Sequence, residues 1–329
     1  MELKIKKYEN NLKEKWDDFV LNDSINGTFL QSRNFLEYHG NRFKDTSLII
    51  YKGEGAIVAV VPACSVIEDN KKIFYSHCGS TFGGIIVGKS FNNIKHMDAI
   101  LDILEEYLES EKYNLAVMKN TTQIFSTGNI ELLSYFLIQR GYHSYCELTS
   151  YIDFVEYNKD ICSNFTKGKR RDYRYSLKQG LEFIRINDDK ELEEFYDTLQ
   201  ENLQKHEKKP VHSLEELLEF KNKRLQNIVE FYGVVWEGKI VAGSMVFNFQ
   251  DRVFHTQYLA SKQQYPHLFL MTFLIANLIN EAAKRKFRYF SFGISTEEHG
   301  KILNKYLAQF KEEFGAQNGL NVTFIKEYD

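Results

Sequence analysis

The sequence predicts an α/β fold built from two similar units. The chain has 329 residues, of which 43% are hydrophobic and 15% aromatic, so it is long enough for two folded domains of about 150 residues each. In each half, helical stretches come before a run of antiparallel strands, and a helix, a strand, a helix and a last strand follow. This repeated order favours duplication of one unit. We place the units at residues 1–155 and 156–329.

The elements of the first half follow from turn residues and apolar periodicity. Turns at 52–55 and at Asp69-Asn70 separate β-rich runs and suit hairpins. A long helix is predicted where Ile94, Met97, Leu101, Leu104 and Leu108 share one face, and a shorter helix ends at Gly141, a typical C-terminal residue. The expected strands are 3–6, 47–51, 55–67, 72–77, 114–118 and 144–155, and the expected helices are 12–21, 34–39, 91–110 and 130–140.

The second half repeats this plan with clearer boundaries. A basic helix ends at Gly180, and Ser213 with Glu216 forms a capping box at the start of another helix. Turns at 237–238 and 250–251 divide a meander of three strands. The expected helices are 166–179, 190–206, 213–224, 268–285 and a segment around Phe310, and the expected strands are 181–186, 228–236, 239–249, 252–260, 287–294 and 321–327.

Composition and missing motifs exclude several classes of protein. The net charge of −3 gives no global attraction to nucleic acid or to a membrane surface, and no run of about 18 apolar residues or secretory signal is found. We therefore expect a cytoplasmic protein with no integral membrane association and no DNA partner. No metal-binding spacing and no GxxxxGK[ST], GxSxG or GxGxxG motif occurs, so metal enzymes, NTPases, serine hydrolases and dinucleotide enzymes are disfavoured.

The cysteines suggest a reducing compartment. Cys64, Cys78, Cys146 and Cys162 are widely spaced and form no CxxC motif. We expect free, mostly buried thiols that act as small core residues.

Several short motifs follow one another in a particular order. The basic helix begins Lys-Gly-Lys-Arg-Arg-Asp-Tyr-Arg at 167–174, and a hairpin lies between Gly233 and Gly243. Phe-Ser-Phe-Gly at 290–293 and Phe-Lys-Glu-Glu-Phe-Gly at 310–315 come next, and the first half has a glycine loop at 79–84. In this order they resemble the Fem-type branch of the GNAT acyltransferase superfamily, which consists of tandem GNAT-like folds related to enzymes that add amino acids to peptidoglycan bridges.

The resemblance implies an N-acyltransferase that moves an acyl or aminoacyl group onto an amine, in cell-envelope or surface-polysaccharide metabolism of bacteria. It implies a degenerate first unit that contributes to the acceptor groove, and a second unit that binds the donor, with the site also reaching the cleft between units. Two residues depart from the pattern: Ser291 stands where the family often has an acid, and Tyr306 replaces a small residue. The first departure puts a role for that acid in doubt, and the second would narrow a channel.

Lys311 is the first candidate for catalysis. Leu303, Leu307, Phe310 and Phe314 are spaced as a buried helical stripe, and Lys311 would lie along its edge. The resemblance implies that the matching lysine lies near the acyl donor, where it stabilises a developing oxyanion. The alternative is a surface lysine whose stem covers apolar residues. Phe310 and Asn304 belong to the expected substrate-binding set.

The basic helix is the candidate anion site. Its cations suit the phosphates of a tRNA acceptor arm, a nucleotide-linked precursor or a carrier prosthetic group, and the alternative is a solvated helix face. No tightly bound cofactor is expected. Acyl-CoA stays open as a donor, although residues 261–267 contain no glycine to approach a pyrophosphate and only Lys262 to meet an anion. The residues assigned to the substrate are Lys169, Arg170, Arg171 and Arg174.

Polar residues elsewhere in the second half complete the prediction. His255 is a candidate general base and Tyr258 a candidate proton donor to the leaving group, although each also suits a structural role. His206 and His212 flank a polar loop, and Glu297 and Glu298 follow a strand where an amine acceptor would bind. Two other functions stay open: a binding module with a decayed active site, and an RNA-binding protein that uses the helix at 167–178.

Overall fold

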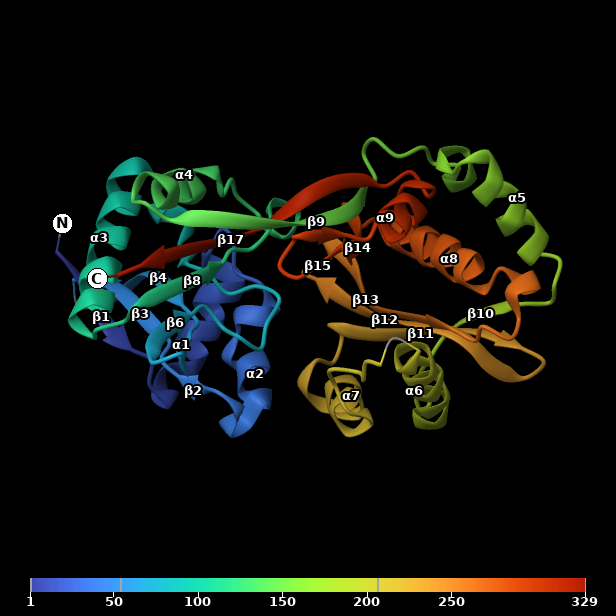
Figure 1. Ribbon diagram of the computed structural model, residues 1–329, viewed down its shortest axis with the longest axis horizontal. Coiled ribbons are helices and arrows are strands. Elements are labelled where there is room, and N and C mark those ends of the chain that lie inside the picture. The colour runs from blue at the N-terminus through green and yellow to red at the C-terminus, as the bar shows by residue number, and fades with distance from the viewer. Residues whose placement is uncertain (1, 54, 206, 329) are drawn as a thin grey trace. The chain divides into compact units, whose positions relative to one another are not determined.

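The chain folds into two compact units. The computed structural model describes residues 2–53, 55–205 and 207–328. The first unit comprises Met1–Glu147 together with Leu320–Asp329, and the second comprises Leu148–Gly319 (Figure 1). Both units combine helices with strands, which confirms the predicted α/β class. Glu54 and His206, which were assigned to a turn and to the substrate site, lie outside the described residues.

The first unit contains two groups of strands. Strands β1, β3, β4 and β7 form one sheet in that order, and β17, β8, β6, β5 and β2 lie side by side in the other. Strands β6 and β8 are parallel. The strands are β1 (Leu3–Lys7), β2 (Lys44–Asp45), β3 (Leu48–Lys52), β4 (Ala56–Val61), β5 (Cys64–Glu68), β6 (Lys71–Tyr75), β7 (Ile86–Val87), β8 (Leu115–Lys119), β9 (His143–Asp153) and β17 (Gln317–Glu327), of which β9 and β17 continue into the second unit.

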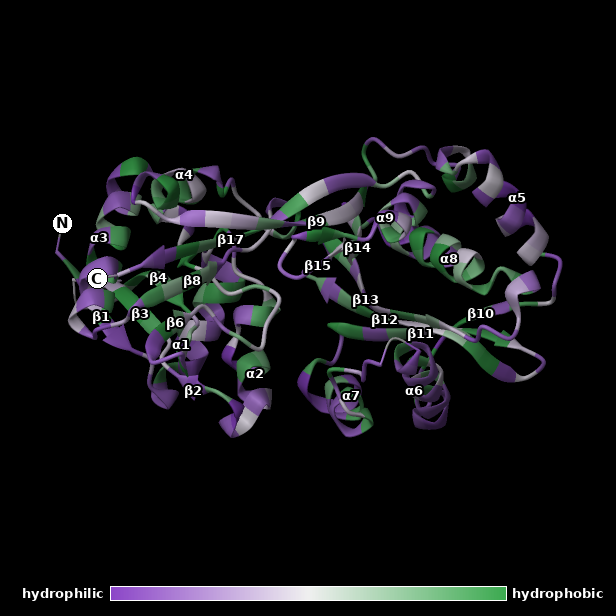
Figure 2. Ribbon diagram, viewed as in Figure 1, coloured by the Kyte–Doolittle hydropathy of each residue, from purple (hydrophilic) through white to green (hydrophobic). Residues whose placement is uncertain are grey.

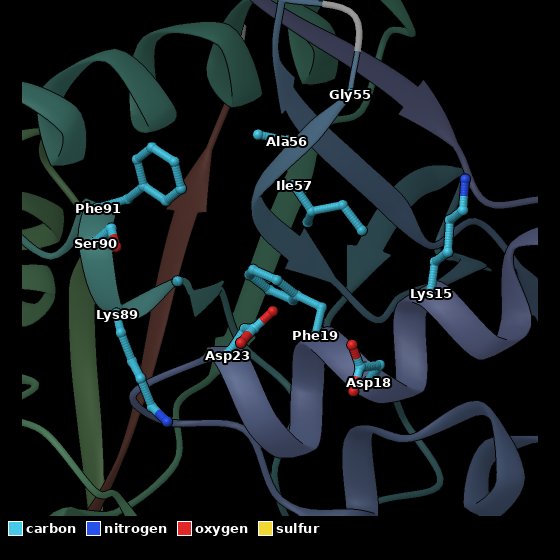
Figure 3. Close-up of a pocket in the computed structure, with 11 residues that line it drawn as sticks. Lys15, Asp18, Phe19, Asp23, Gly55, Ala56, Ile57, Lys89, Ser90 and Phe91 are labelled. Atoms are coloured by element: carbon cyan, nitrogen blue, oxygen red, sulfur yellow. The ribbon is translucent and has the colours of Figure 1, made fainter.

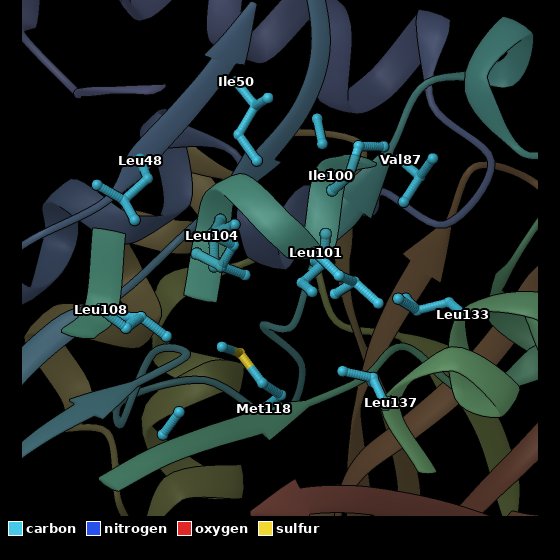
Figure 4. Packing of buried hydrophobic residues seen from close by; sticks show 14 of the residues in the cluster. Leu48, Ile50, Val87, Ile100, Leu101, Leu104, Leu108, Met118, Leu133 and Leu137 are labelled. Atoms are coloured by element: carbon cyan, nitrogen blue, oxygen red, sulfur yellow. The ribbon is translucent and has the colours of Figure 1, made fainter. Parts of the chain in front are cut away.

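Helix α3 (Ile94–Ser110) supplies much of the core of the first unit. Its predicted apolar face is buried at Met97, Leu101, Leu104 and Leu108, but Ile94 is exposed because it stands at the first position of the helix. Figure 4 shows these leucines packed against strands β3 and β8 and helix α4. The other helical segments are η1 (Asn10–Leu12), α1 (Lys13–Asp18), η2 (Phe19–Asp23), η3 (Phe29–Gln31), α2 (Arg33–Leu36), η4 (Glu37–Arg42), η5 (Lys89–Phe91), η6 (Gln123–Phe125) and α4 (Glu131–Gln139).

The second unit is built on a mixed sheet. The strand order is β10, β11, β12, β13, β14 and β9, in which β13 and β14 are parallel and the other neighbours are antiparallel. The strands are β10 (Glu182–Arg185), β11 (Val229–Trp236), β12 (Lys239–Phe249), β13 (Val253–Ser261), β14 (Tyr289–Ile294), β15 (Thr296–Glu297) and β16 (Ile302–Leu303), of which the last two form a separate small ladder.

Helices cover both faces of this sheet. Figure 1 shows α6 and α7 on one side of β11 to β13, with α5 and α8 on the other. Figure 2 shows α8 as mostly hydrophobic, whereas α5 and α6 are largely hydrophilic. No helix in the described part of the chain is long and apolar enough to cross a membrane. The helical segments are η7 (Ile161–Asn164), α5 (Lys167–Ser176), α6 (Asp189–Gln204), α7 (Leu214–Glu219), η8 (Phe220–Arg224), η9 (Pro266–Leu268), α8 (Leu270–Lys284) and α9 (Lys305–Glu312).

Local signals placed several boundaries correctly. Ser213 accepts a hydrogen bond from the main-chain N–H of Glu216, and the Glu216 side chain accepts one from the N–H of Ser213, which confirms the predicted capping box. Gly180 adopts φ of +70°, but helix α5 already ends at Ser176, so the helix predicted over 166–179 is shorter than expected and residues 177–180 form a turn. The strand predicted at 55–67 is instead two strands, β4 and β5, with a break at Pro62 and Ala63, because proline cannot donate a ladder hydrogen bond.

The prediction of four free thiols is wrong for two of them. A disulfide joins Cys64 to Cys78, whereas Cys146 and Cys162 are free. Cys64 pairs with Tyr75 across the β5–β6 hairpin, so the chain returns to it three residues later. The spacing of 14 residues forms no motif, which explains why the sequence did not reveal the pair.

Candidate active site

The site is built where two neighbouring strands of the second unit stop pairing. Strands β13 and β14 pair through only three positions, which end at His255 opposite Ser291. Both strands continue beyond that point, to Ser261 and Ile294. The register of β14 against β9 also shifts between Ser291 and Gly293, where the glycine adopts φ of +72°. Main-chain groups just beyond Ser291 can therefore turn toward side chains instead of a strand partner.

Lys311 is directed into this region from helix α9. The Asn304 side chain caps the helix by accepting from the N–H of Leu307 at 3.0 Å. The Lys311 side chain is only 3% exposed. Its Nζ donates to the carbonyl oxygens of Gly293 at 2.9 Å and Ile294 at 2.7 Å. Burial lowers the pKa of Lys311 to about 7, because the charged ammonium loses hydration and faces carbonyl dipoles without a carboxylate.

The buried stripe of α9 differs from the predicted one. Leu303 and Leu307 are exposed, at 43% and 39%, and the inward residues are Ala308 and Lys311, followed by Phe314. Leu303 precedes the helix in β16, so helical spacing did not apply to it. The prediction placed Lys311 on the edge of an apolar stripe, and the structure places it at the centre of the buried face.

His255 lies beside this lysine. A hydrogen bond of 3.0 Å joins His255 Nδ1 and Ser291 Oγ, and Ser291 Oγ also accepts from the N–H of Gly293 at 3.3 Å. A Cβ at Gly293 would lie 3.4 Å from Cε1 of His255. Burial lowers the pKa of His255 to about 4; a hydrogen bond with the Gln257 side chain opposes this shift, and the charge of Lys311 adds to it. The imidazole is therefore neutral near pH 7.

Tyr258 has a different partner. The bulge that pairs Thr256 with Val246 and Tyr258 with Met245 places Tyr258 on the same sheet face as His255. Its hydroxyl forms a hydrogen bond of 2.8 Å with Nδ1 of His212, which is buried. Burial raises the pKa of Tyr258 to about 12, although hydrogen bonds from the main chain near His212 oppose the shift. The structure thus brings Tyr258 together with His212, a pairing that the sequence did not indicate.

The basic helix α5 borders a pocket of about 780 Å³. Arg170, Arg171 and Arg174 line it, with Lys167, Gly168, Tyr175 and Lys178. Lys169 points elsewhere: it is buried, forms an ion pair of 2.9 Å with Glu313, and lies 4.3 Å from the Phe310 ring centroid. Lys169 and Phe310 therefore connect α5 to α9, and the pocket cations come from the other faces of the helix.

The remaining predicted residues are more dispersed. Lys262 follows β13, and its N–H donates to the carbonyl of Val241. Glu297 lies in β15, and Glu298 adopts φ of +49° in the turn between β15 and β16. Both glutamates are exposed. The structure brings together Lys311, His255 and Ser291; sequence reasoning noted Ser291 only as a departure from a motif and did not anticipate the two carbonyl oxygens that hold Lys311.

Comparisons with known proteins show what this fold is similar to. Residues 163–301 match the model of the acetyltransferase (GNAT) domain. No curated protein matches the sequence. The structure of FemX is similar over 100% of this chain and 98% of its own, with a TM-score of 0.72 and 13% identity. L-PGS from Bacillus licheniformis is similar over 98% and 94%, with a TM-score of 0.61 and 13% identity.

Another similar structure also consists of two tandem GNAT units. A tandem GNAT protein from the clavulanic acid biosynthesis pathway is similar over 99% of this chain and 98% of its own, with a TM-score of 0.55 and 10% identity. These identities establish likeness of fold. The predicted tandem GNAT architecture and the resemblance to the Fem-type branch are confirmed at that level, and residues 163–301 match the GNAT acetyltransferase domain.

Proposed function

We propose that this protein is an N-acyltransferase that moves an acyl or aminoacyl group from a phosphate-bearing donor to an amine, with its reaction centre at Lys311. The observation that carries the proposal is the buried ammonium of Lys311, which is held by two main-chain carbonyls beside the neutral imidazole of His255. A cation kept out of water interacts strongly with a developing oxyanion. The GNAT domain match and the likeness to FemX support this class of reaction.

The chemistry requires a proton acceptor as well as a cation. The acceptor amine attacks the carbonyl carbon of the donor ester or thioester, and the carbonyl oxygen becomes an oxyanion that Lys311 stabilises. The nitrogen then loses a proton, the tetrahedral intermediate collapses to an amide, and the alcohol or thiol leaves with a proton. When Nδ1 of His255 donates to Ser291 Oγ, Nε2 is the unprotonated ring nitrogen, and it would accept the proton of the amine in exchange for its present hydrogen bonding.

The donor would place its phosphates in the pocket of helix α5. Arg170, Arg171 and Arg174 offer planar, bidentate donors for phosphate oxygens. The connection after β13 contains Tyr265 and Pro266 and no glycine, which favours aminoacyl-tRNA or a carrier-protein thioester over acyl-CoA. The acceptor would be an amine of cell-envelope or surface-polysaccharide metabolism in the cytoplasm, an assignment that rests on the resemblance to Fem-type proteins.

The test compares the three donor classes in one format. Purified full-length protein is incubated with labelled aminoacyl-tRNA, with acyl-CoA or with an acyl-carrier protein, and with a mixture of amine-bearing envelope precursors. Transfer of label to an amide that withstands mild alkali supports the proposal, and Lys311→Met should abolish most of it. Binding of uncharged tRNA with a steep salt dependence, but without transfer, would instead favour an RNA-binding protein. Donor binding without turnover, unaffected by Lys311→Met, would favour a non-catalytic module.

A further inference from the structure

A cavity in the first unit has no place in the proposed reaction. Its volume is about 510 Å³, within the range of about 300–1,000 Å³ that is common for small-molecule sites. One wall is the end of α1 with the helical turn η2, and the opposite wall consists of the start of β4 and the turn η5 (Figure 3). The described residues that line it include none of those assigned to the reaction centre.

The floor of this cavity is apolar and fixed in place. The rings of Phe19 and Phe91 approach each other around Gly88: a Cβ on this glycine would lie 3.1 Å from a ring carbon of Phe19 and 3.0 Å from one of Phe91. Phe19 is 5% exposed and belongs to a small core cluster, so its ring cannot move far. Ile57 completes the floor, and Figure 3 shows it across the Phe19 ring from the helix.

Charges of both signs surround this apolar floor. Asp18 and Asp23 lie on the helical wall, and Lys15 and Lys89 also line the cavity. Within the described part of the chain, no ion pair involves any of these four side chains. Asp18 accepts a hydrogen bond of 2.7 Å from the Asn22 side chain, and Lys89 Nζ donates to the carbonyl of Asn22 at 2.5 Å. The carboxylates and ammonium groups therefore do not neutralise one another.

We propose that this cavity binds the zwitterion of an α-amino acid with an apolar side chain. Asp23 would receive the ligand ammonium, and Lys89, which lies on the same side of the cavity, would receive its carboxylate. The ligand side chain would cover Phe19 and Phe91, whose burial supplies the apolar share of the binding energy. A purely apolar ligand would contact only the floor of the cavity, and a ligand with a single charge would engage only one of the two side chains Asp23 and Lys89.

The experiment measures binding to the full-length protein by calorimetry and by ligand-observed NMR. The three probes are L-phenylalanine, L-phenylalanine amide, which lacks the carboxylate, and N-acetyl-L-phenylalanine, which lacks the ammonium. We expect saturable binding of L-phenylalanine and at least about tenfold weaker binding of each derivative, since a charge-assisted hydrogen bond contributes about 1.5–3 kcal/mol. Lys311→Met should bind all three probes as the unaltered protein does, which separates this site from the proposed reaction.

Charge-removing variants locate the site. In Asp23→Asn, L-phenylalanine should bind more weakly, while binding of N-acetyl-L-phenylalanine is little affected. The difference in affinity between these two probes should therefore be smaller in the variant than in the unaltered protein. In Lys89→Met, the difference in affinity between L-phenylalanine and L-phenylalanine amide should likewise be smaller than in the unaltered protein. Asp69→Asn and Lys95→Gln are matched controls, because both residues are exposed in the first unit and do not line the cavity.

Three results would overturn the proposal. The first is no saturable binding of L-phenylalanine up to about 10 mM, where even a millimolar site would be occupied. The second is equal affinity for all three probes, which would show an apolar pocket that ignores charge. The third is binding that Asp23→Asn and Lys89→Met leave unchanged, which would place the ligand elsewhere.

Discussion

A hydrogen bond of 2.9 Å runs from Nζ of Lys311 to the carbonyl oxygen of Gly293. The glycine adopts φ of +72°, a conformation that places strain on other residues and here turns its carbonyl toward helix α9. A carbonyl satisfies a donor of the ammonium without cancelling its charge. Lys311 is therefore both well bonded and uncompensated, and this combination explains its depressed pKa.

Replacing Lys311 should affect turnover more than donor binding. We expect Lys311→Met to lower kcat by about 10- to 100-fold or more, because an interaction with the oxyanion is lost in the transition state. Lys311→Arg keeps a cation and should retain part of the activity. Steady-state assays with whichever donor class supports transfer measure both variants. A kcat that Lys311→Met leaves unchanged would remove Lys311 from the mechanism.

The contribution of Lys311 should depend on pH. Its pKa is lowered to about 7, so the ammonium is the main form below that pH and the neutral amine is the main form above it. If the cation is the active form, the ratio of the rate of the unaltered protein to that of Lys311→Met falls as pH rises through about 7. Taking this ratio cancels the ionisation of the acceptor amine. A ratio that rises with pH would assign Lys311 the role of base.

The ionisation of Lys311 should also make the free energy of unfolding depend on pH, and this free energy should rise with pH. The folded pKa of about 7 lies below the ordinary lysine pKa of 10.5, so the unfolded chain binds more protons between these two values. The unfolding free energy of the unaltered protein should therefore rise relative to that of Lys311→Met by about 2 kcal/mol between pH 7 and pH 9. Urea denaturation at the two pH values measures it. A constant difference would show that Lys311 is not desolvated in the folded protein.

The hydrogen bond between His255 and Ser291 can be tested by replacing each of the two residues in turn. His255→Ala should lower kcat by about 10- to 100-fold if the imidazole accepts the proton of the amine. Ser291→Ala should have a smaller effect, because it removes only the hydroxyl that orients Nδ1. Tyr258→Phe serves as the comparison: its hydroxyl bonds His212, so we expect activity within a few-fold of the unaltered protein. If Tyr258→Phe lowered kcat more than His255→Ala, Tyr258 and not His255 would be the residue that takes part in proton transfer.

Charges on helix α5 should control donor affinity and its dependence on salt. Arg170→Gln or Arg174→Gln should weaken binding of a phosphate-bearing donor and reduce the slope of log K against log salt by about one unit per lost phosphate contact. Lys190→Gln, an exposed lysine on α6, is the matched control. Binding isotherms at several salt concentrations provide the slope. Equal slopes in all variants would show that the donor does not contact α5.

The sequence was most informative where structure is local. The capping box at Ser213 and the strand meander depend on neighbouring residues, and both were predictable. The motif that ends at Gly315 also drew attention to Lys311. Its burial was not predictable, because Leu303 belongs to strand β16 and the helix turns Ala308 inward instead.

Contacts between distant segments could not be predicted. His255 meets Ser291, which is 36 positions later in the sequence, because the crossover through α8 makes β14 parallel to β13. Neither segment carries a signal for that register. The Cys64–Cys78 disulfide and the approach of His212 to Tyr258 depend in the same way on chain geometry that no motif records.

The main-chain anchor of Lys311 has a consequence for protein engineering. Both of its acceptors belong to the backbone, so a change of the side chain at position 294 leaves them in place. The side chains of Ile294, Leu303 and Leu307 are exposed and contribute little to the core. They can therefore be randomised together in a library, and a selection for changed ligand preference would begin from variants that still fold and still hold the lysine.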